Sequence, residues 1–210
     1  GGLWVQVWGS GNVSNVVFLR NNVHHTGDWQ ASYDQDGHGT GLYRSSGAGG
    51  AISNVWILDS QYSYNSGDGI QINANGWTSN GKIHHVYVGR NVAHHNKQAG
   101  FWSKMASDVV FSQNEAYEHR PSDSSSGQCM GYQYGPENVW FLFNEVHDCD
   151  YGIQVVSDDG GAGRNVYLVG ASEGGVRLVA EIGDRESADE LVLAAESQRA
   201  QDELTRLNDA

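Results

Sequence analysis

The chain has 210 residues, enough for one domain with a sizeable core, and its 28 glycines and 2 prolines are typical of neither a disordered linker nor collagen. A formal net charge of −13 disfavours a phosphate-binding surface, so we expect no nucleic-acid partner. The sequence has no run of about 18 apolar residues, and we expect no membrane partner. It begins GGLWVQVWG, without a methionine or a charged-then-apolar leader, which favours a processed or excised start.

A valine-containing phrase recurs along the chain and predicts one strand per repeat. It reads NVVFLRN, NVWILDS, HVYVGRN, DVVFSQN, NVWFLFN and NVYLVGA, with first valines at residues 16, 55, 86, 109, 139 and 166. The spacings between these valines are 39, 31, 23, 30 and 27 residues, so the repeated unit is constant and the loops vary. Strand alternation places each first valine, and the apolar residue two positions later, on one side that faces a core.

Each valine phrase ends at a corner that is usually occupied by asparagine. The corner residues are Asn21, Ser60, Asn91, Asn114, Asn144 and Ala171. Stacked asparagine side chains can bond the backbone of a tight turn and tolerate left-handed geometry, so we predict an asparagine ladder. A short strand follows the corner, and its inward residues are Val23, Tyr62, Ala93, Ala116 and Val146.

A glycine-containing phrase completes each repeat. It reads GTGLYRS, SGDGIQIN, QAGFWSK, QCMGYQY and CDYGIQV, beginning at residues 39, 66, 98, 128 and 149. Its predicted strand has an inward column formed by Leu42, Ile70, Phe101, Tyr132 and Ile153. The outward column is Trp4, Tyr43, Gln71, Trp102, Gln133 and Gln154. Two residues further along come Gln6, Ser45, Asn73 and Lys104.

Three short strands in each repeat describe one coil of a parallel solenoid. On these phrases, the sequence resembles the right-handed parallel β-helix proteins of the pectate-lyase-like superfamily over residues 1–170. The resemblance implies an all-β fold, a right-handed parallel β-helix of about six coils. An antiparallel sandwich would fit the strand lengths but would leave the asparagine ladder unexplained.

Residues 1–170 are therefore expected to form the β-helix domain, and residues 171–210 a partly helical C-terminal cap or tail. Ser187 and Glu190 match a capping box. An apolar stripe at helical spacing follows, formed by Leu193, Ala200, Leu204 and Leu207. A solenoid must cover its last coil, so we expect a cap; an unrelated tail after a truncated repeat is the alternative.

The outward column of the glycine phrases is expected to bind a polysaccharide, because exposed aromatic rings stack on sugar faces and amides bond hydroxyls. Neighbouring rungs of a sheet are about 4.8 Å apart, so these side chains would form one strip. The expected substrate-binding residues are Trp4, Tyr43, Gln71, Asn73, Trp102, Gln133 and, from the preceding loop, His38. For Gln133 and Gln154, a stabilising ladder between rungs is the alternative.

Two basic residues are candidates for the catalytic base that the resemblance implies. In the lyases that this sequence resembles, a Lys or Arg takes the C5 proton of a uronate, and calcium or another cation neutralises the substrate. Lys104 is the only lysine on the strip, and Arg120 belongs to a loop that would overhang it. YDQDG (residues 33–37) and SDDGG (residues 157–161) offer oxygen ligands but match no established calcium loop, so calcium is a candidate cofactor and no metal ligand is assigned.

Hydrolases of the same fold use paired carboxylates instead, and Asp36 and Asp68 on adjacent coils are the candidate acid and base. The adjacent double aspartate of the polygalacturonase group is missing, because Asp68 is flanked by Gly67 and Gly69. We therefore expect a polysaccharide lyase or epimerase that is secreted or extracellular. A glycoside hydrolase and a non-catalytic glycan-binding or adhesin module are the alternatives.

Cysteine and histidine complete the set of candidate residues. Cys129 and Cys149 fall in equivalent loops of consecutive coils, which predicts a disulfide in an oxidising compartment; two separate thiols are the alternative. His24, His94 and His147 share an outward column after the corner. Alternate rungs about 10 Å apart are too far for two imidazoles to share a metal, so we expect an exposed polar ladder there, with acid–base chemistry as a minor alternative.

Overall fold

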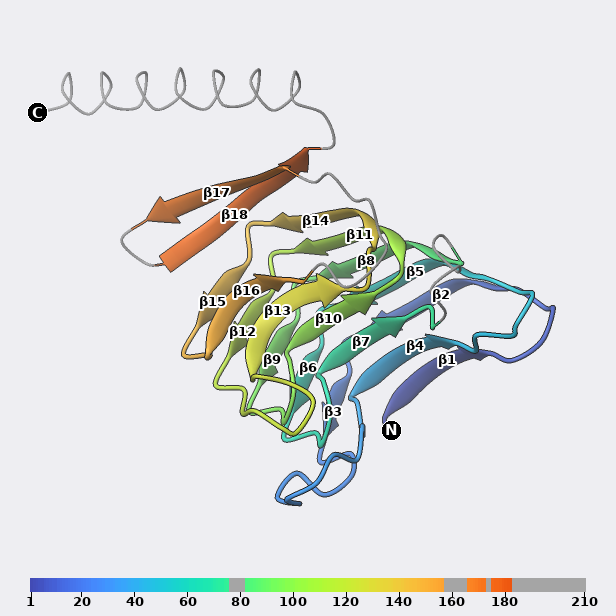
Figure 1. Ribbon diagram of the computed structural model, residues 1–210, viewed down its shortest axis with the longest axis horizontal. Coiled ribbons are helices and arrows are strands. Elements are labelled where there is room, and N and C mark those ends of the chain that lie inside the picture. The colour runs from blue at the N-terminus through green and yellow to red at the C-terminus, as the bar shows by residue number, and fades with distance from the viewer. Residues whose placement is uncertain (76–81, 157–165, 173–174, 183–210) are drawn as a thin grey trace, which may run out of the picture.

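The computed structural model describes residues 1–75, 82–156, 166–172 and 175–182. Three parallel sheets of six, five and five strands wind around a common core, as a parallel β-helix does (Figure 1). Within these residues, no helix is long and apolar enough to cross a membrane.

Each coil contributes one strand to each sheet. Sheet A contains, in spatial order, β1 (Leu3–Val7), β4 (Thr40–Arg44), β7 (Ile70–Asn73), β10 (Phe101–Lys104), β13 (Gln128–Gln133) and β16 (Tyr151–Val155). Sheet B contains β2 (Val13–Leu19), β5 (Ile52–Leu58), β8 (Ile83–Gly89), β11 (Ser107–Ser112) and β14 (Glu137–Leu142). Sheet C contains β3 (Asn22–His24), β6 (Gln61–Ser63), β9 (Val92–His94), β12 (Glu115–Tyr117) and β15 (Glu145–His147).

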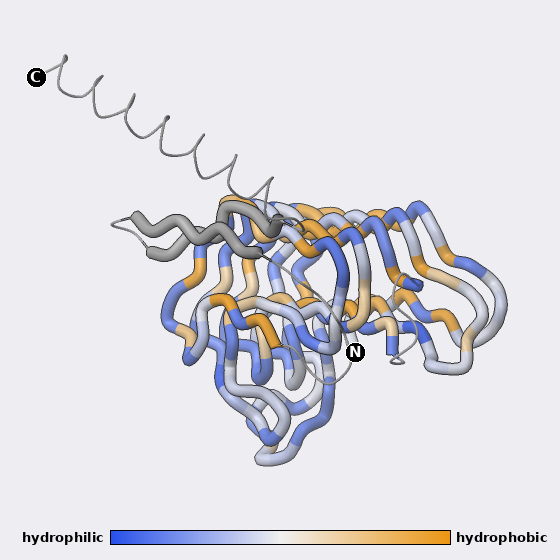
Figure 2. Tube along the Cα trace, turned by 45° about the horizontal axis from the view of Figure 1, so that its top comes forward, coloured by the Kyte–Doolittle hydropathy of each residue, from blue (hydrophilic) through white to orange (hydrophobic). Residues whose placement is uncertain are grey.

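The inward side chains of the three sheets form one continuous core, as the valine phrases predict. Val55, Val86, Val109 and Val139 lie opposite one another on adjacent strands of sheet B and are buried. Hydrophobic positions recur in neighbouring coils along the whole solenoid (Figure 2). Because one residue of each coil packs on the equivalent residue of the next, the core runs the length of the helix.

Asparagine side chains at the corner between sheets B and C link the coils, which confirms the predicted ladder. Asn144 Oδ1 accepts the backbone N–H of Asn114 at 2.9 Å, and Asn114 Oδ1 accepts that of Asn91 at 3.0 Å. Asn114 Nδ2 also donates to the Val88 carbonyl at 2.9 Å. The left-handed conformation falls one residue earlier, at Gln113 (φ 56°). The asparagines therefore supply hydrogen bonds between coils, and the residue before them makes the turn.

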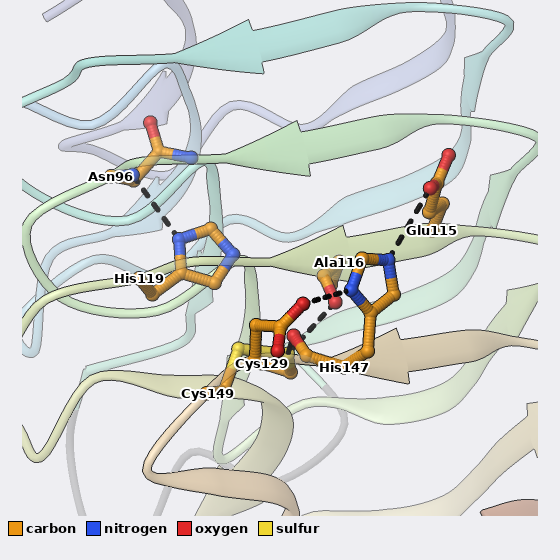
Figure 3. The surroundings of a disulfide bond; sticks show 8 residues. Asn96, Glu115, Ala116, His119, Cys129, His147 and Cys149 are labelled. Carbon is orange, nitrogen blue, oxygen red and sulfur yellow. Dashed lines mark hydrogen bonds and ion pairs between the residues drawn. A yellow bond between two sulfur atoms is a disulfide. The ribbon is translucent and has the colours of Figure 1, made fainter. Parts of the chain in front are cut away.

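A second ladder, which the sequence analysis missed, lies at the corner between sheets C and A. The Thr26 N–H donates to Asn65 Oδ1 at 3.1 Å, and the Asn65 N–H donates to Asn96 Oδ1 at 3.2 Å. The next coil continues this ladder with an imidazole, because the Asn96 N–H donates to His119 Nδ1 at 3.2 Å (Figure 3). His119 thus takes the place of an asparagine in the ladder.

The sixth valine phrase departs from the prediction. β17 (Val166–Ser172) pairs antiparallel with β18 (Gly175–Ile182) and does not add a sixth strand to sheet B. In the sequence, Ala171 stands where the earlier phrases carry asparagine or serine. β18 lies against β14 and β15, the last strands of sheets B and C (Figure 1). The predicted helical segment from Ser187 to Ala210 lies outside the described residues.

A disulfide joins Cys129 and Cys149, as predicted. The two Cα atoms are 5.6 Å apart, and the bond ties the start of β13 to the segment between β15 and β16 (Figure 3). The bond therefore lies in the last described coils of the helix.

Candidate functional site

A pocket of about 280 Å³ lies on the outer face of sheet A. Its floor is formed by Gln71, Asn73, Trp102, Lys104 and Gln133, from three adjacent strands, β7, β10 and β13. The loops that precede β4, β7 and β10 supply wall residues, among them Asp36, His38, Asp68 and Gln98. The structure therefore gathers eight of the residues that the sequence analysis selected as catalytic or substrate-binding candidates.

The strands of sheet A pair with a register that corrects one predicted column. Trp102 lies opposite Gln71 and Gly131, whereas Lys104 lies opposite Asn73 and Gln133. Gln133 therefore belongs to the row of Lys104, two residues from its predicted place. Met130 takes the inward position that was assigned to Tyr132.

The predicted alignment of β4 with its neighbours in sheet A is also wrong by two residues. The Thr40 N–H donates to the Gly69 carbonyl, and Tyr43 lies opposite Asn73. Tyr43 therefore occupies the place predicted for Ser45, and Gly41 lies opposite Trp4. The polar Thr40 at an inward position concealed this register. An error of two residues preserves which side faces outwards, so the predicted faces of the strands are correct.

Trp102 is buried, contrary to the prediction of an exposed stacking platform. Its side chain lies over Gly131, where an added Cβ would be 2.5 Å from Cζ3 of the indole, and the residue is only 2% exposed. Trp102 Nε1 donates to Gln133 Oε1 at 3.0 Å, which fixes this amide beside Lys104. Trp102 thus shapes the pocket floor and orients Gln133.

Trp4 and Tyr43 are half-buried and do not line the pocket. The Trp4 ring covers Gly41, where an added Cβ would be 2.5 Å from Cε3. Tyr43 accepts a hydrogen bond from Asn75 Nδ2 at 2.7 Å and lies 5.4 Å from the Trp8 ring. These rings extend along sheet A towards β1, beyond the pocket.

Asp68 is buried, and both of its carboxylate oxygens are engaged. Oδ1 accepts the Ala99 N–H at 2.8 Å, and Oδ2 accepts Gln71 Nε2 at 2.7 Å. His38 Nδ1 lies 3.5 Å from Oδ2 and accepts the Asp68 N–H at 2.8 Å. A buried carboxylate with these bonds is held in place and orients the side chains around it.

His38 is nearly fully buried at the wall of the pocket, and this burial lowers its pKa although the charges of Asp68 and Asp36 act in the opposite direction. The imidazole is therefore neutral. Because Nδ1 accepts a hydrogen bond, Nε2 carries the proton. Asp36 accepts a hydrogen bond from Gln98 Nε2 at 2.8 Å and is exposed.

Lys104 also lines the pocket, and its surroundings differ from those of Asp68, which is held by hydrogen bonds. Its side chain is half-buried between Asn73 and Gln133 on the neighbouring strands, and it forms no hydrogen bond or ion pair with the described residues. Lys97, by contrast, is buried and donates to the carbonyls of Ala31 (2.9 Å) and Tyr33. Lys97 therefore holds the loop before β4, and Lys104 supplies a cation to the pocket.

Arg120 does not reach the pocket lining. Its guanidinium lies 4.8 Å from the centre of the Trp29 ring, in the loop between β3 and β4. Asp34 of this loop connects to the loop before β13: burial raises its pKa, but hydrogen bonds from Ser124 and Ser122 and the charge of Lys97 outweigh burial and lower it. These contacts join two loops that are far apart in the sequence above one pocket.

Sequence analysis missed five pocket residues: Gln98, Ser124, Ser125, Gln128 and Tyr134. Gln128 Oε1 accepts hydrogen bonds from Ser125 Oγ at 2.9 Å and from the Ser126 N–H at 3.1 Å, which orders the loop before β13. A signal was present, because Gln98 and Gln128 both come two to three residues before the first inward residue of their strands.

The predicted column of histidines lies on sheet C, away from the pocket. His94, Tyr117 and His147 lie on adjacent strands with nearly parallel rings, whose centres are 5.1 and 4.8 Å apart. His147 also lies 3.5 Å from Glu115 Oε1 (Figure 3). Over the residues that the structure describes, no three His, Cys, Asp or Glu side chains are grouped to hold a metal ion.

Comparison with known proteins identifies the family. Residues 4–170 match the family model for a right-handed β-helix region. The chain therefore belongs to the right-handed β-helix family. No curated protein and no solved structure matches it.

Proposed function

We propose that the protein binds a uronate-containing polysaccharide along sheet A and cleaves it by β-elimination, with Lys104 as the base. Lys104 carries this proposal, because its amine lines the pocket and forms no hydrogen bond or ion pair with the residues that the structure describes. Five amide side chains line the same pocket, and amides bond sugar hydroxyls and carboxylates.

The chemistry follows from the position of Lys104. In its unprotonated form, the Lys104 amine takes the proton from C5 of the uronate, next to the carboxylate. The electron pair of that C–H bond forms the C4–C5 double bond, the C4–O bond breaks, and the departing sugar oxygen takes up a proton. Return of a proton to C5 in place of bond cleavage would give an epimer, so both reactions share this first step.

The hydrolase alternative needs two carboxyl groups that face the substrate. Asp36 has one oxygen hydrogen-bonded to Gln98, and Asp68 has both oxygens bonded within the protein. This arrangement favours elimination over hydrolysis. A non-catalytic module would use the same amides for binding and form no product.

Calcium has no fitting site among the described pocket residues. A calcium ion needs six to eight oxygen ligands. Both oxygens of Asp68 accept hydrogen bonds, and the amide oxygens of Gln71 and Gln133 accept hydrogen bonds from Asn73 and Trp102. The SDDGG segment lies outside the described residues. We therefore derive no step through a metal.

A panel of acidic and neutral polysaccharides tests the proposal. An unsaturated uronate, detected by its ultraviolet absorbance, is the expected product from a uronate polymer. New reducing ends without unsaturation would mean hydrolysis, and retention on the polymer without any product would mean a binding module. The disulfide supports an extracellular site of action, because such bonds persist in oxidising compartments.

A further inference from the structure

The outer face of sheet B carries a continuous aromatic and aliphatic column. Val17, Trp56, Tyr87, Val110 and Trp140 lie opposite one another on the five strands, which run side by side in Figure 1. Val17 is 55% and Trp56 39% exposed, and Tyr87, Val110 and Trp140 are half-buried. Apolar side chains that face water in an uninterrupted row usually have a partner.

A polar column runs beside it. Asn15, Asn54, His85, Asp108 and Asn138 precede the apolar column by two residues, and each has a positive φ of 53–59°. Asn54 Nδ2 donates to Asn15 Oδ1 at 3.3 Å, and Asn138 Nδ2 donates to Asp108 Oδ1 at 3.0 Å. Three of these five side chains are amides, and the other two are the imidazole of His85 and the carboxylate of Asp108, which lie 3.9 Å apart.

The two columns suit a sugar polymer by geometry and by charge. Rungs about 4.8 Å apart repeat the rings and amides at close to the length of one pyranose unit. The apolar column has no charged residue, and neither column holds a Lys or Arg that could pair with an anionic polymer. Sugar hydroxyls both donate and accept at every unit, so they can bond the N–H groups and the oxygens of the amides in the polar column.

We propose that the outer face of sheet B is a second carbohydrate-binding surface, which binds a neutral polysaccharide chain along the helix axis. It is separate from the pocket on sheet A and does not depend on the function proposed for that pocket. The sugar faces stack on Trp56, Tyr87 and Trp140, and the hydroxyls bond the flanking amides.

Affinity electrophoresis of the full chain tests this surface. The gels contain a soluble β-glucan or glucomannan, with polygalacturonate in a parallel gel. Trp56→Ala and Trp140→Ala are each expected to weaken retardation by the neutral polymer about two- to tenfold, the effect of one lost aromatic contact. Val17→Glu, which adds a charge at an exposed position without removing packing, is expected to do the same.

Two matched variants serve as controls. Trp8→Ala removes an exposed tryptophan that contacts Tyr43 beside sheet A, and Lys104→Ala alters only the pocket. Both are expected to keep wild-type retardation by the neutral polymer. Absence of retardation in every neutral gel, or retardation unchanged by all three sheet B variants, would overturn the proposal. So would self-association in sedimentation that these variants abolish, because it would assign the face to a second copy.

Discussion

The Trp102 indole covers Gly131 on the next strand, and an added Cβ at Gly131 would lie 2.5 Å from Cζ3 of the ring. The same Cβ would be 1.9 Å from the Gln154 carbonyl oxygen. Gly131 therefore allows the indole to lie flat on the floor of the pocket and to hold Gln133. Neither neighbour has room for a methyl group.

Gly131→Ala should consequently destabilise the protein by about 1–3 kcal/mol, the usual cost of overpacking. Urea unfolding measures this change, and a shift in Trp fluorescence should accompany it. Gly47→Ala is the matched control, because an added Cβ there meets no atom within 4 Å. Equal stability of the two variants would contradict the close packing of Trp102.

Asn114→Ala should destabilise the helix by about 1–3 kcal/mol for each buried group that loses its partner. The Asn91 N–H and the Val88 carbonyl are the two groups concerned. Asn114→Ser should recover part of the loss, since Ser60 serves in the same ladder. Asn22→Ala, at an exposed position in β3, should change the free energy of unfolding little. If Asn114→Ala were equally neutral, the ladder would not contribute to stability.

His119 should make stability dependent on pH in the acid range. Burial, reinforced by the charge of His94, lowers the pKa of His119 to about 3, whereas the ordinary value is 6.5. Between these values the unfolded chain binds a proton that the folded chain does not, so stability falls as the pH falls from 6.5 towards 3. The loss is on the order of 4 kcal/mol over the whole range.

His119→Asn isolates this contribution. Asparagine is the residue that the two preceding coils use in the same ladder, and it does not titrate. The difference in unfolding free energy between wild type and variant should therefore change with pH below 6.5 and stay constant above it. A difference that is constant from pH 7 to 4 would show that His119 is not held neutral in the folded state.

Removal of the disulfide should cost about 3 kcal/mol, as expected for the release of a closed loop of this size. The double variant Cys129→Ser, Cys149→Ser can be compared with the wild type by urea unfolding with and without reductant. Reductant should destabilise the wild type and leave the variant unchanged. Two free thiols in the unfolded, unreduced wild type would show that the bond does not form.

The fold and the faces of its strands could be predicted, because inward apolar residues alternate with outward residues in every repeated phrase. The alternation around Val55 and Val86 predicts the core, and Asn91 predicts the corner. The register of sheet A could not be predicted in full, because Thr40 and Met130 take inward places that the alignment of glycines assigned elsewhere. The antiparallel pairing of β17 was not predicted, because the segment around Val166 repeats the valine phrase of the parallel strands.

The contents of the pocket were harder to foresee than its position. Trp102 was expected to be exposed, but its burial depends on Gly131, which belongs to another coil and whose register was unknown. Arg120 was expected near the pocket, but Trp29 from a distant loop holds its guanidinium. Contacts between loops of different coils carry no periodic signal, so Ser124 and Ser125 were not found.

Replacement of Lys104 by alanine tests the proposed function most directly. A uronate polymer that the wild type converts to an unsaturated product should be bound by Lys104→Ala with nearly the same affinity, because the pocket amides remain. The rate of product formation should fall by at least about a hundredfold, as for the loss of a general base. Lys82→Ala, at an exposed position outside the pocket, should retain full activity. Undiminished formation of the unsaturated product by Lys104→Ala would contradict Lys104 as the base.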